Sequence, residues 1–109
     1  MDALTPLTYS ILVALADSPR HGYGIIKEIE ERTGVGTAPS TGALYLALHR
    51  MEAEGLIEEA KKRPAADDAR RRYWALTRPG REAARTESRR LSAVLASARK
   101  KDLLAGDSA

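Results

Sequence analysis

The segment from Ser40 to Gly55 (STGALYLALHRMEAEG) constrains the fold most strongly, because its pattern predicts a single helix with two unlike faces. A helix turns by about 100° per residue, so apolar residues three and four positions apart fall on one stripe. The apolar stripe, which must be buried, consists of Leu44, Ala47, Leu48 and Met51. Ser40 is the expected N-cap and Gly55 the expected stop.

The opposite face of this helix is narrow and carries few charges. It presents Gly42, Leu46, His49 and Ala53, with Tyr45 and Arg50 at its edges. A helix with a buried back and a narrow front is what the major groove of DNA admits. The alternative is an ordinary amphipathic helix of a protein core, and the pattern of this one helix does not exclude it.

Two further helices are predicted before this segment. The first covers about residues 5–16, opening with an N-cap threonine and a proline and ending before Asp17-Ser18-Pro19. The second covers about residues 21–33, and a glycine follows it as the stop. Gly22 and Gly24 in its first turn predict a close approach of a neighbouring helix, since glycine is otherwise costly there. The second helix, a short turn and the Ser40 helix together form a helix-turn-helix arrangement.

A β-hairpin is predicted to follow. Residues 56–61 and 71–77 have the composition of two short strands, and residues 62–70 are expected to form a polar loop between them with basic residues at both ends. Helices followed by a hairpin with a basic loop describe a winged helix-turn-helix. Because side chains alternate along a strand, Arg71 and Arg72 must point to opposite faces.

The last predicted helix runs from Arg78 to about Leu104, a length of about 40 Å at about 1.5 Å per residue. Its apolar stripe is narrow and reaches beyond a compact winged domain, so we expect it to pack on a second subunit. The dimerisation residues are expected to be Leu91, Val94, Leu95 and Ala98. The alternative is a partly disordered tail, especially beyond Arg99.

These elements predict a mainly α fold: a winged helix-turn-helix with a two-stranded β-wing and a long C-terminal dimerisation helix. The expected division is a DNA-binding domain at residues 1–77, the dimerisation helix at 78–105 and a disordered tail at 106–109.

Composition excludes several classes of function. The chain of 109 residues has no Cys and two His, so disulfides, thiolate sites and metal clusters are not expected. It carries no nucleophile elbow, P-loop or dinucleotide-binding fingerprint, and we expect neither enzymatic activity nor a cofactor. No apolar run approaches a membrane span, and an acid stands near the N-terminus, so a cytoplasmic protein without membrane association is expected.

The net charge of +3 conceals an asymmetry between the two halves of the chain. Residues 1–60 hold four Lys or Arg against nine Asp or Glu, whereas residues 61–109 hold fourteen against six. A basic half points to a polyanionic partner. The alternative is that the basic side chains are simply exposed to solvent. We favour this alternative for the last helix, and we favour binding of a polyanion for the basic cluster at 61–72.

In order and spacing, several short motifs resemble the PadR family of bacterial transcriptional regulators over about residues 4–82. They are His21-Gly22-Tyr23-Gly24-Ile25, Gly42-Ala43-Leu44-Tyr45, Arg50-Met51-Glu52, Gly55-Leu56-Ile57, Arg70-Arg71-Arg72-Tyr73-Trp74, and Leu76-Thr77 with Gly80. The resemblance implies a homodimeric DNA-binding repressor in which the last helix of each subunit packs against the N-terminal region of the other. Some members of the family respond to phenolic acids or to several drugs held at the dimer interface.

Candidate DNA contacts fall into two groups. Those expected to bind phosphate are Ser40, Thr41, Lys61, Lys62, Arg63, Arg70, Arg71 and Arg72. Those expected to reach base edges are Tyr45, Leu46 and His49, with Arg50 equally suited to phosphate. The family often has basic residues where this chain has Leu46 and His49. Either the wing therefore binds more phosphate here, or Leu46 touches a thymine methyl.

Two aromatic residues are candidates for a small-molecule effector site. Trp74 is expected to pack in the hairpin core, or else to line an interface pocket for a planar ligand, and Tyr9 is a weaker candidate of the same kind.

The predicted function is sequence-specific regulation of transcription by a homodimer on double-stranded DNA with a near-palindromic operator. The alternative is a winged-helix module that binds another protein and not DNA, which the acidic first half and the charge-poor helix at Ser40–Gly55 favour.

Overall fold

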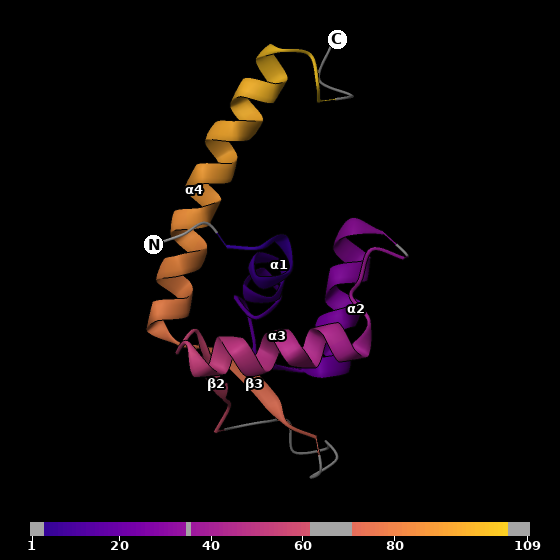
Figure 1. Ribbon diagram of the computed structural model, residues 1–109, viewed down its shortest axis with the longest axis vertical. Helices are drawn as coiled ribbons and strands as arrows, with labels where there is room; N and C mark the ends of the chain where they lie inside the picture. Colours follow the sequence, from indigo (N-terminus) through magenta and orange to yellow (C-terminus); the bar gives the residue numbers. More distant parts are fainter. Residues whose placement is uncertain (1–3, 35, 62–70, 105–109) are drawn as a thin grey trace.

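The computed structural model describes residues 4–34, 36–61 and 71–104 (Figure 1). Its helices are α1 (Pro6–Ala14), α2 (Gly22–Thr33), α3 (Thr41–Ala53) and α4 (Arg78–Lys100). Its strands are β1 (Arg20–His21), β2 (Ile57–Glu59) and β3 (Tyr73–Leu76). The predicted fold class is confirmed: the chain is mainly helical, with a small antiparallel sheet and a long last helix.

Side-chain caps set where the helices begin. The hydroxyls of Thr5, Ser40 and Thr77 each accept a backbone N–H three residues later, at 3.1, 3.2 and 3.1 Å. These caps confirm the predicted starts of α1, α3 and α4. The ends are less well predicted, because α1 stops at Ala14 and α4 at Lys100, each short of the expected residue.

Within the described residues the sheet has three strands in the order β1-β3-β2, all antiparallel, where two strands were predicted. The additional strand, β1, pairs Arg20 with Trp74 and His21 with Tyr73. A strand of two residues carries no alternation that a sequence pattern could detect, which explains why it was missed. Its consequence is that the start of α2 is fastened directly to the wing.

The core lies between α1, α2, α3 and the sheet. The largest side chains that are less than 2% exposed are Ile11, Leu12, Ile25, Leu44, Leu48, Met51 and Ile57. The apolar stripe predicted for α3 is therefore buried. Trp74 is 4% exposed and belongs to the same core, as its packing interpretation predicted.

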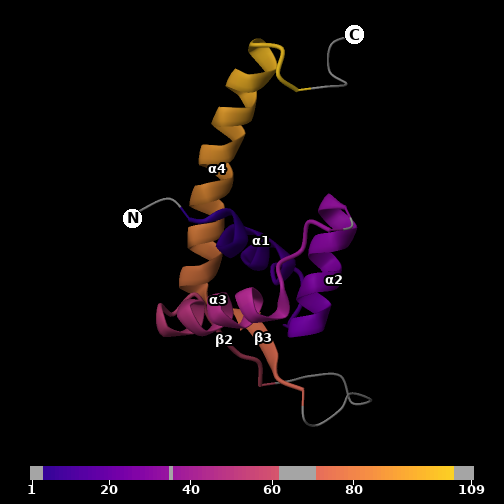
Figure 2. The same cartoon turned by 45° about the vertical axis from the view of Figure 1, so that its right-hand side comes forward.

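The first half of α4 packs on this core. Ala83 and Glu87 are buried there, and the hydroxyl of Tyr9 in α1 lies 2.7 Å from that of Ser88. The C-terminal half of the helix extends away from the other elements (Figures 1 and 2). The distal half of α4 thus has little of the described chain to pack against.

The approach of α4 to the wing depends on Gly80. A Cβ atom built at Gly80 would lie 1.9 Å from the carbonyl oxygen of Leu56, which is backbone and cannot move aside cheaply. We predict that Gly80→Ala lowers the free energy of unfolding by about 2–3 kcal/mol, measured by urea denaturation. Gly42→Ala is the control, since beyond the adjacent backbone of its own helix its added Cβ would meet no described atom within 4 Å, and it should raise stability by about 0.5–1 kcal/mol. Equal effects of the two substitutions would contradict this packing.

Glu87 is a buried acid of α4, with 5% of its surface exposed. The hydrogen bond from Arg90 lowers the pKa of its carboxyl below the ordinary 4.5, the Arg90 charge and the backbone N–H of Leu4 lower it further, and burial opposes them. Because the folded pKa is lowered, the ionised carboxylate stabilises the fold above about pH 4.5, and that stabilisation is lost as pH falls through the folded pKa.

We therefore predict that Glu87→Gln is less stable than the natural chain at pH 7 and that the gap narrows as pH falls below about 4.5. Urea midpoints between pH 7 and pH 3 measure this gap. Glu82→Gln, at an exposed carboxylate of the same helix, is the control and should change stability little. A gap that stays constant or widens in acid would show that the carboxylate charge does not stabilise the fold.

Candidate nucleic-acid interface

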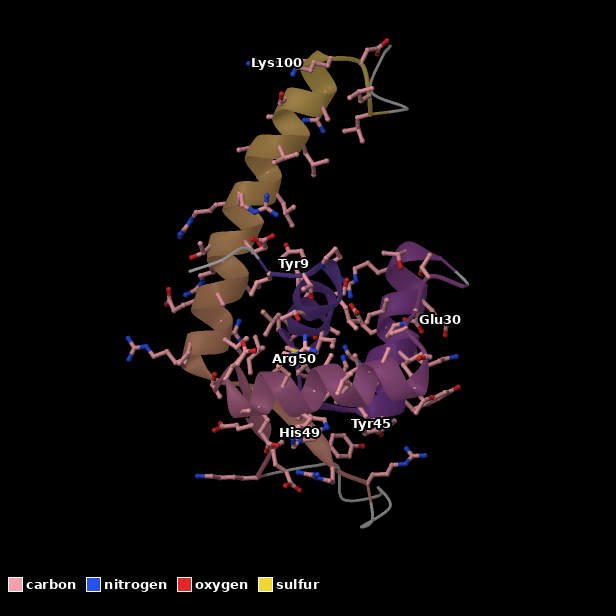
Figure 3. The ribbon with its side chains drawn as sticks, viewed as in Figure 1. Tyr9, Glu30, Tyr45, His49, Arg50 and Lys100 are labelled. Atoms are coloured by element: carbon pink, nitrogen blue, oxygen red, sulfur yellow. The ribbon has the colours of Figure 1, made fainter. Side chains whose placement is uncertain are left out.

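The front of α3 is exposed along its length while its back is buried. Tyr45 is 51% exposed and Leu46 63%, and His49 and Arg50 are also exposed. Figure 3 shows Tyr45 and His49 together on the side of α3 that faces the strands, with Arg50 on the other side of the helix. The structure therefore brings two of the predicted base-contacting residues together and sets Arg50 apart from them.

The start of α3 offers backbone donors beside exposed hydroxyls. Ser40 and Thr41 are both exposed, and the Ser40 hydroxyl is occupied in capping the N–H of Ala43 at 3.2 Å. The N–H groups of a first helical turn and the helix dipole both favour an anion. The predicted phosphate contact at this end of α3 is thus compatible with the local geometry.

Part of the predicted basic cluster lies in the described part of the wing. Lys61, Arg71 and Arg72 are exposed there, whereas Lys62, Arg63 and Arg70 lie outside the described residues. Arg72 covers the ring of Trp74 at 4.6 Å and lies 3.3 Å from a carboxylate oxygen of Glu59. This ion pair is about half exposed on both sides, so it holds Arg72 only weakly.

Arg71 has a different environment from that of Arg72. Its Nη1 atom lies 3.0 Å from Nε2 of His21, across from the start of α2. The two arginines therefore have different neighbours, as strand alternation predicted.

A hollow of about 310 Å³ lies where α2, α3 and β3 meet. Its lining residues are His21, Gly22, Tyr23, Tyr45, Arg71 and Arg72. Gly22 makes room for Tyr45, because a Cβ at Gly22 would lie 2.5 Å from the phenolic oxygen. The predicted close approach is thus found at Gly22, and it brings Tyr45 of α3 against the start of α2. Gly24 has only ordinary contacts.

Sequence reasoning missed His21 as a candidate functional residue. Its Nδ1 atom accepts the N–H of Gly24 at 3.1 Å and so caps α2, and its ring packs edge-on against Tyr73 at 5.2 Å. The signal was present in the His21-Gly22-Tyr23-Gly24 motif. The partner in the wing could not be found from that motif, because the pairing joins residues 50 positions apart.

The distal half of α4 exposes an apolar stripe. Val94 is 52% exposed and Leu95 50%, and Leu91 and Ala98 are partly buried. These are the four residues predicted to form a dimer interface, and they lie on one side of the helix at spacings of three and four.

A larger groove, of about 450 Å³, lies between α1 and α4. Its lining residues are Val13, Ala16, Leu76, Arg81, Ala84, Arg85, Ser88 and Arg89. Neither Tyr9 nor Trp74, the two predicted effector contacts, lines this groove. Tyr9 hydrogen-bonds to Ser88 at the groove's edge, and Trp74 is in the core.

Within residues 4–34, 36–61 and 71–104, no group of three or more His, Cys, Asp or Glu is placed to hold a metal ion. Among the same residues, none of the helices has both the length and the apolar character that crossing a membrane requires.

Comparison with known proteins identifies relatives by sequence. A profile of the "Transcriptional regulator PadR-like family" matches residues 11–86. "Transcriptional regulator Rv3488" of Mycobacterium tuberculosis is 37% identical over 98 residues, which are 90% of this chain and 82% of that protein. An uncharacterised 37.1 kDa protein in transposon TN4556 of Streptomyces fradiae is 44% identical over 72 residues, 66% of this chain but only 19% of the transposon protein.

Solved structures share the fold. A PadR family transcription regulator from Clostridium difficile has a TM-score of 0.76 at 25% identity, covering 88% of this chain and 97% of that one. PadR of Bacillus subtilis, in complex with operator DNA, has a TM-score of 0.64 at 22% identity and covers 75% of this chain and 46% of that one. At that identity, the second likeness concerns the fold alone.

Proposed function

Because the chain belongs to the PadR-like family of transcriptional regulators, we propose that it regulates transcription by binding double-stranded DNA sequence-specifically as a homodimer. The observation that carries this proposal is the exposed front of α3, whose back is buried and whose Tyr45 lines one hollow with Arg71 and Arg72. The Bacillus subtilis structure in complex with operator DNA supports it by analogy of fold.

In this proposal, α3 enters the major groove with Tyr45, Leu46 and His49 toward base edges. Leu46 is 63% exposed and uncharged, which suits contact with a thymine methyl group. Phosphate is bound by the start of α3, by Arg50 and by the wing bases Lys61, Lys62, Arg63, Arg70, Arg71 and Arg72. The wing supplies most of the positive charge, since α3 itself carries little.

We propose that the distal half of α4 forms the dimer interface. Val94 and Leu95 are apolar, half exposed and followed along the helix by Ala98, so a second subunit would remove their surface from water. Two recognition helices related by a twofold axis would read a near-palindromic operator, with half-sites about one helical turn apart.

For the mode of regulation, the proposal relies on analogy with the family. We propose repression in the cytoplasm, with release by a small aromatic or hydrophobic ligand held at the dimer interface, where Tyr9 and Trp74 are the candidate contacts. Tyr9 is the better supported of the two contacts, because it is only partly buried whereas Trp74 is in the core.

If the wing binds phosphate, changing Arg70, Arg71 and Arg72 together to Ala should weaken binding to every DNA sequence. The logarithm of the DNA-binding constant falls with the logarithm of the salt concentration, and each phosphate contact that is removed should make this fall shallower by about 1. Fluorescence anisotropy at several salt concentrations measures the slope. Arg85→Ala, which removes an exposed base of α4, should leave the slope nearly unchanged. Unchanged affinity of the triple variant would refute the role of the wing.

If α4 is the dimer interface, Leu95→Asp should convert the dimer to a monomer, because burying an unpaired carboxylate is costly. Leu95 is half exposed within its own chain, so the fold of the subunit should survive. Ala93→Asp adds the same charge to the opposite side of the helix and should leave a dimer. Light scattering gives the mass of each variant, and a dimeric Leu95→Asp protein would rule out this interface.

A further inference from the structure

An acid and a base are paired across the two strands of the wing. Nη2 of Arg72, which stands just before β3, lies 3.3 Å from a carboxylate oxygen of Glu59, the last residue of β2. Glu59 is directly opposite Trp74 in the β2–β3 register, and Arg72 precedes Trp74 by two residues. Residues two apart on a strand share a face of the sheet, and so do residues directly opposite each other on paired strands. The three side chains therefore lie together on one face.

The indole ring of Trp74 supports the guanidinium from one side. The central carbon of the Arg72 guanidinium lies 4.6 Å from the ring centroid, and Trp74 is itself buried in the core. A guanidinium stacks on an aromatic ring through its flat face, whereas its N–H groups donate along its edges. Trp74 therefore positions Arg72 and leaves the edges of the guanidinium for an acceptor.

Glu59 is the acceptor at one of these edges. The side chains of Arg72 and Glu59 are 57% and 53% exposed, and an ion pair so open to water is weak enough to be exchanged for another anion. Arg72 also lines the hollow of about 310 Å³ that Tyr45 of α3 lines. The paired guanidinium thus lies beside the exposed front of α3, where we propose that DNA binds.

A DNA phosphate at this position would compete with the carboxylate of Glu59. Phosphate binds a guanidinium best through two parallel N–H···O bonds along one edge. Two anions on the same group repel each other at close range. To bind phosphate through that edge, Arg72 must release Glu59, and the carboxylate is then left unpaired beside a polyanion.

We propose that Glu59 limits the affinity of the wing for DNA by competing with backbone phosphate for the Arg72 guanidinium. This inference rests on the proposed DNA binding. Glu59 acts through Arg72 and is a positioning residue, which need not touch the DNA. Trp74 keeps the guanidinium in place while phosphate replaces the carboxylate. Because phosphate contacts provide affinity for DNA of any sequence, the carboxylate lowers binding to all sequences.

Neighbouring residues provide a matched set of variants. Glu59→Gln removes the negative charge but keeps a side-chain oxygen that can accept from Arg72. Glu58→Gln is the control, because it removes the same charge one residue earlier, where strand alternation directs the side chain to the opposite face. Arg72→Gln, alone and combined with Glu59→Gln, shows whether the effect passes through the guanidinium. All three positions are exposed, so each variant should fold, which circular dichroism verifies.

The test measures binding to a fluorescein-labelled duplex of random sequence by anisotropy. A salt concentration of about 0.1 M screens charges more than about 10 Å apart. Glu59→Gln should bind about threefold to tenfold more tightly than the natural chain, against less than about twofold for Glu58→Gln. In the Arg72→Gln background, Glu59→Gln should have no more effect than Glu58→Gln has in the natural chain.

The remaining outcomes separate this inference from the proposed function. If the natural chain binds the duplex and Glu59→Gln binds no more tightly than Glu58→Gln, the competition is refuted and the proposed function stands. An equal gain with and without Arg72 would also refute it, because Glu59 would then repel DNA without acting through the guanidinium. If neither the natural chain nor any variant binds this duplex or DNA from upstream of the gene, the proposed function fails, and the competition for phosphate fails with it.

Discussion

Burial of one stripe of α3 is the interaction on which the rest of the structure depends. Leu44, Leu48 and Met51 are almost fully inaccessible to water, and burying each contributes roughly 1.5–3 kcal/mol. The stripe fixes the rotation of α3 about its axis, because turning the helix would expose these side chains. The same constraint keeps Tyr45 and Leu46 on the outside. The orientation of the exposed front of α3 thus follows from core packing.

Close contacts position the other elements around α3. Gly80 allows the start of α4 to approach the backbone at Leu56, and Gly22 allows α2 to approach Tyr45. The pairing of β1 with β3 then fastens the start of α2 to the wing. The sheet is thus in contact with both the start of α2 and α4, which are distant in sequence. By contrast, the distal half of α4 is left with an exposed apolar stripe, which is where we propose that a second subunit binds.

The features that the sequence predicted are those encoded locally. Thr5, Ser40 and Thr77 mark helix starts because a cap is formed within three residues, and the α3 stripe is visible because its period is that of a helix. The third strand and the His21–Arg71 contact were missed because both depend on pairing between distant segments. The roles of individual residues in DNA binding and dimerisation remain predictions, and Lys62, Arg63 and Arg70 lie outside the described residues.

The most direct test of DNA regulation by this chain is binding of the purified protein to DNA from upstream of its own gene. Random DNA of equal length, at two salt concentrations, is the comparison. We predict clear preference for the upstream fragment and loss of affinity at the higher salt, because phosphate contacts release counterions. Weak binding to both fragments, together with no specific site in genome-wide occupancy, would contradict DNA recognition and favour a module that binds another protein.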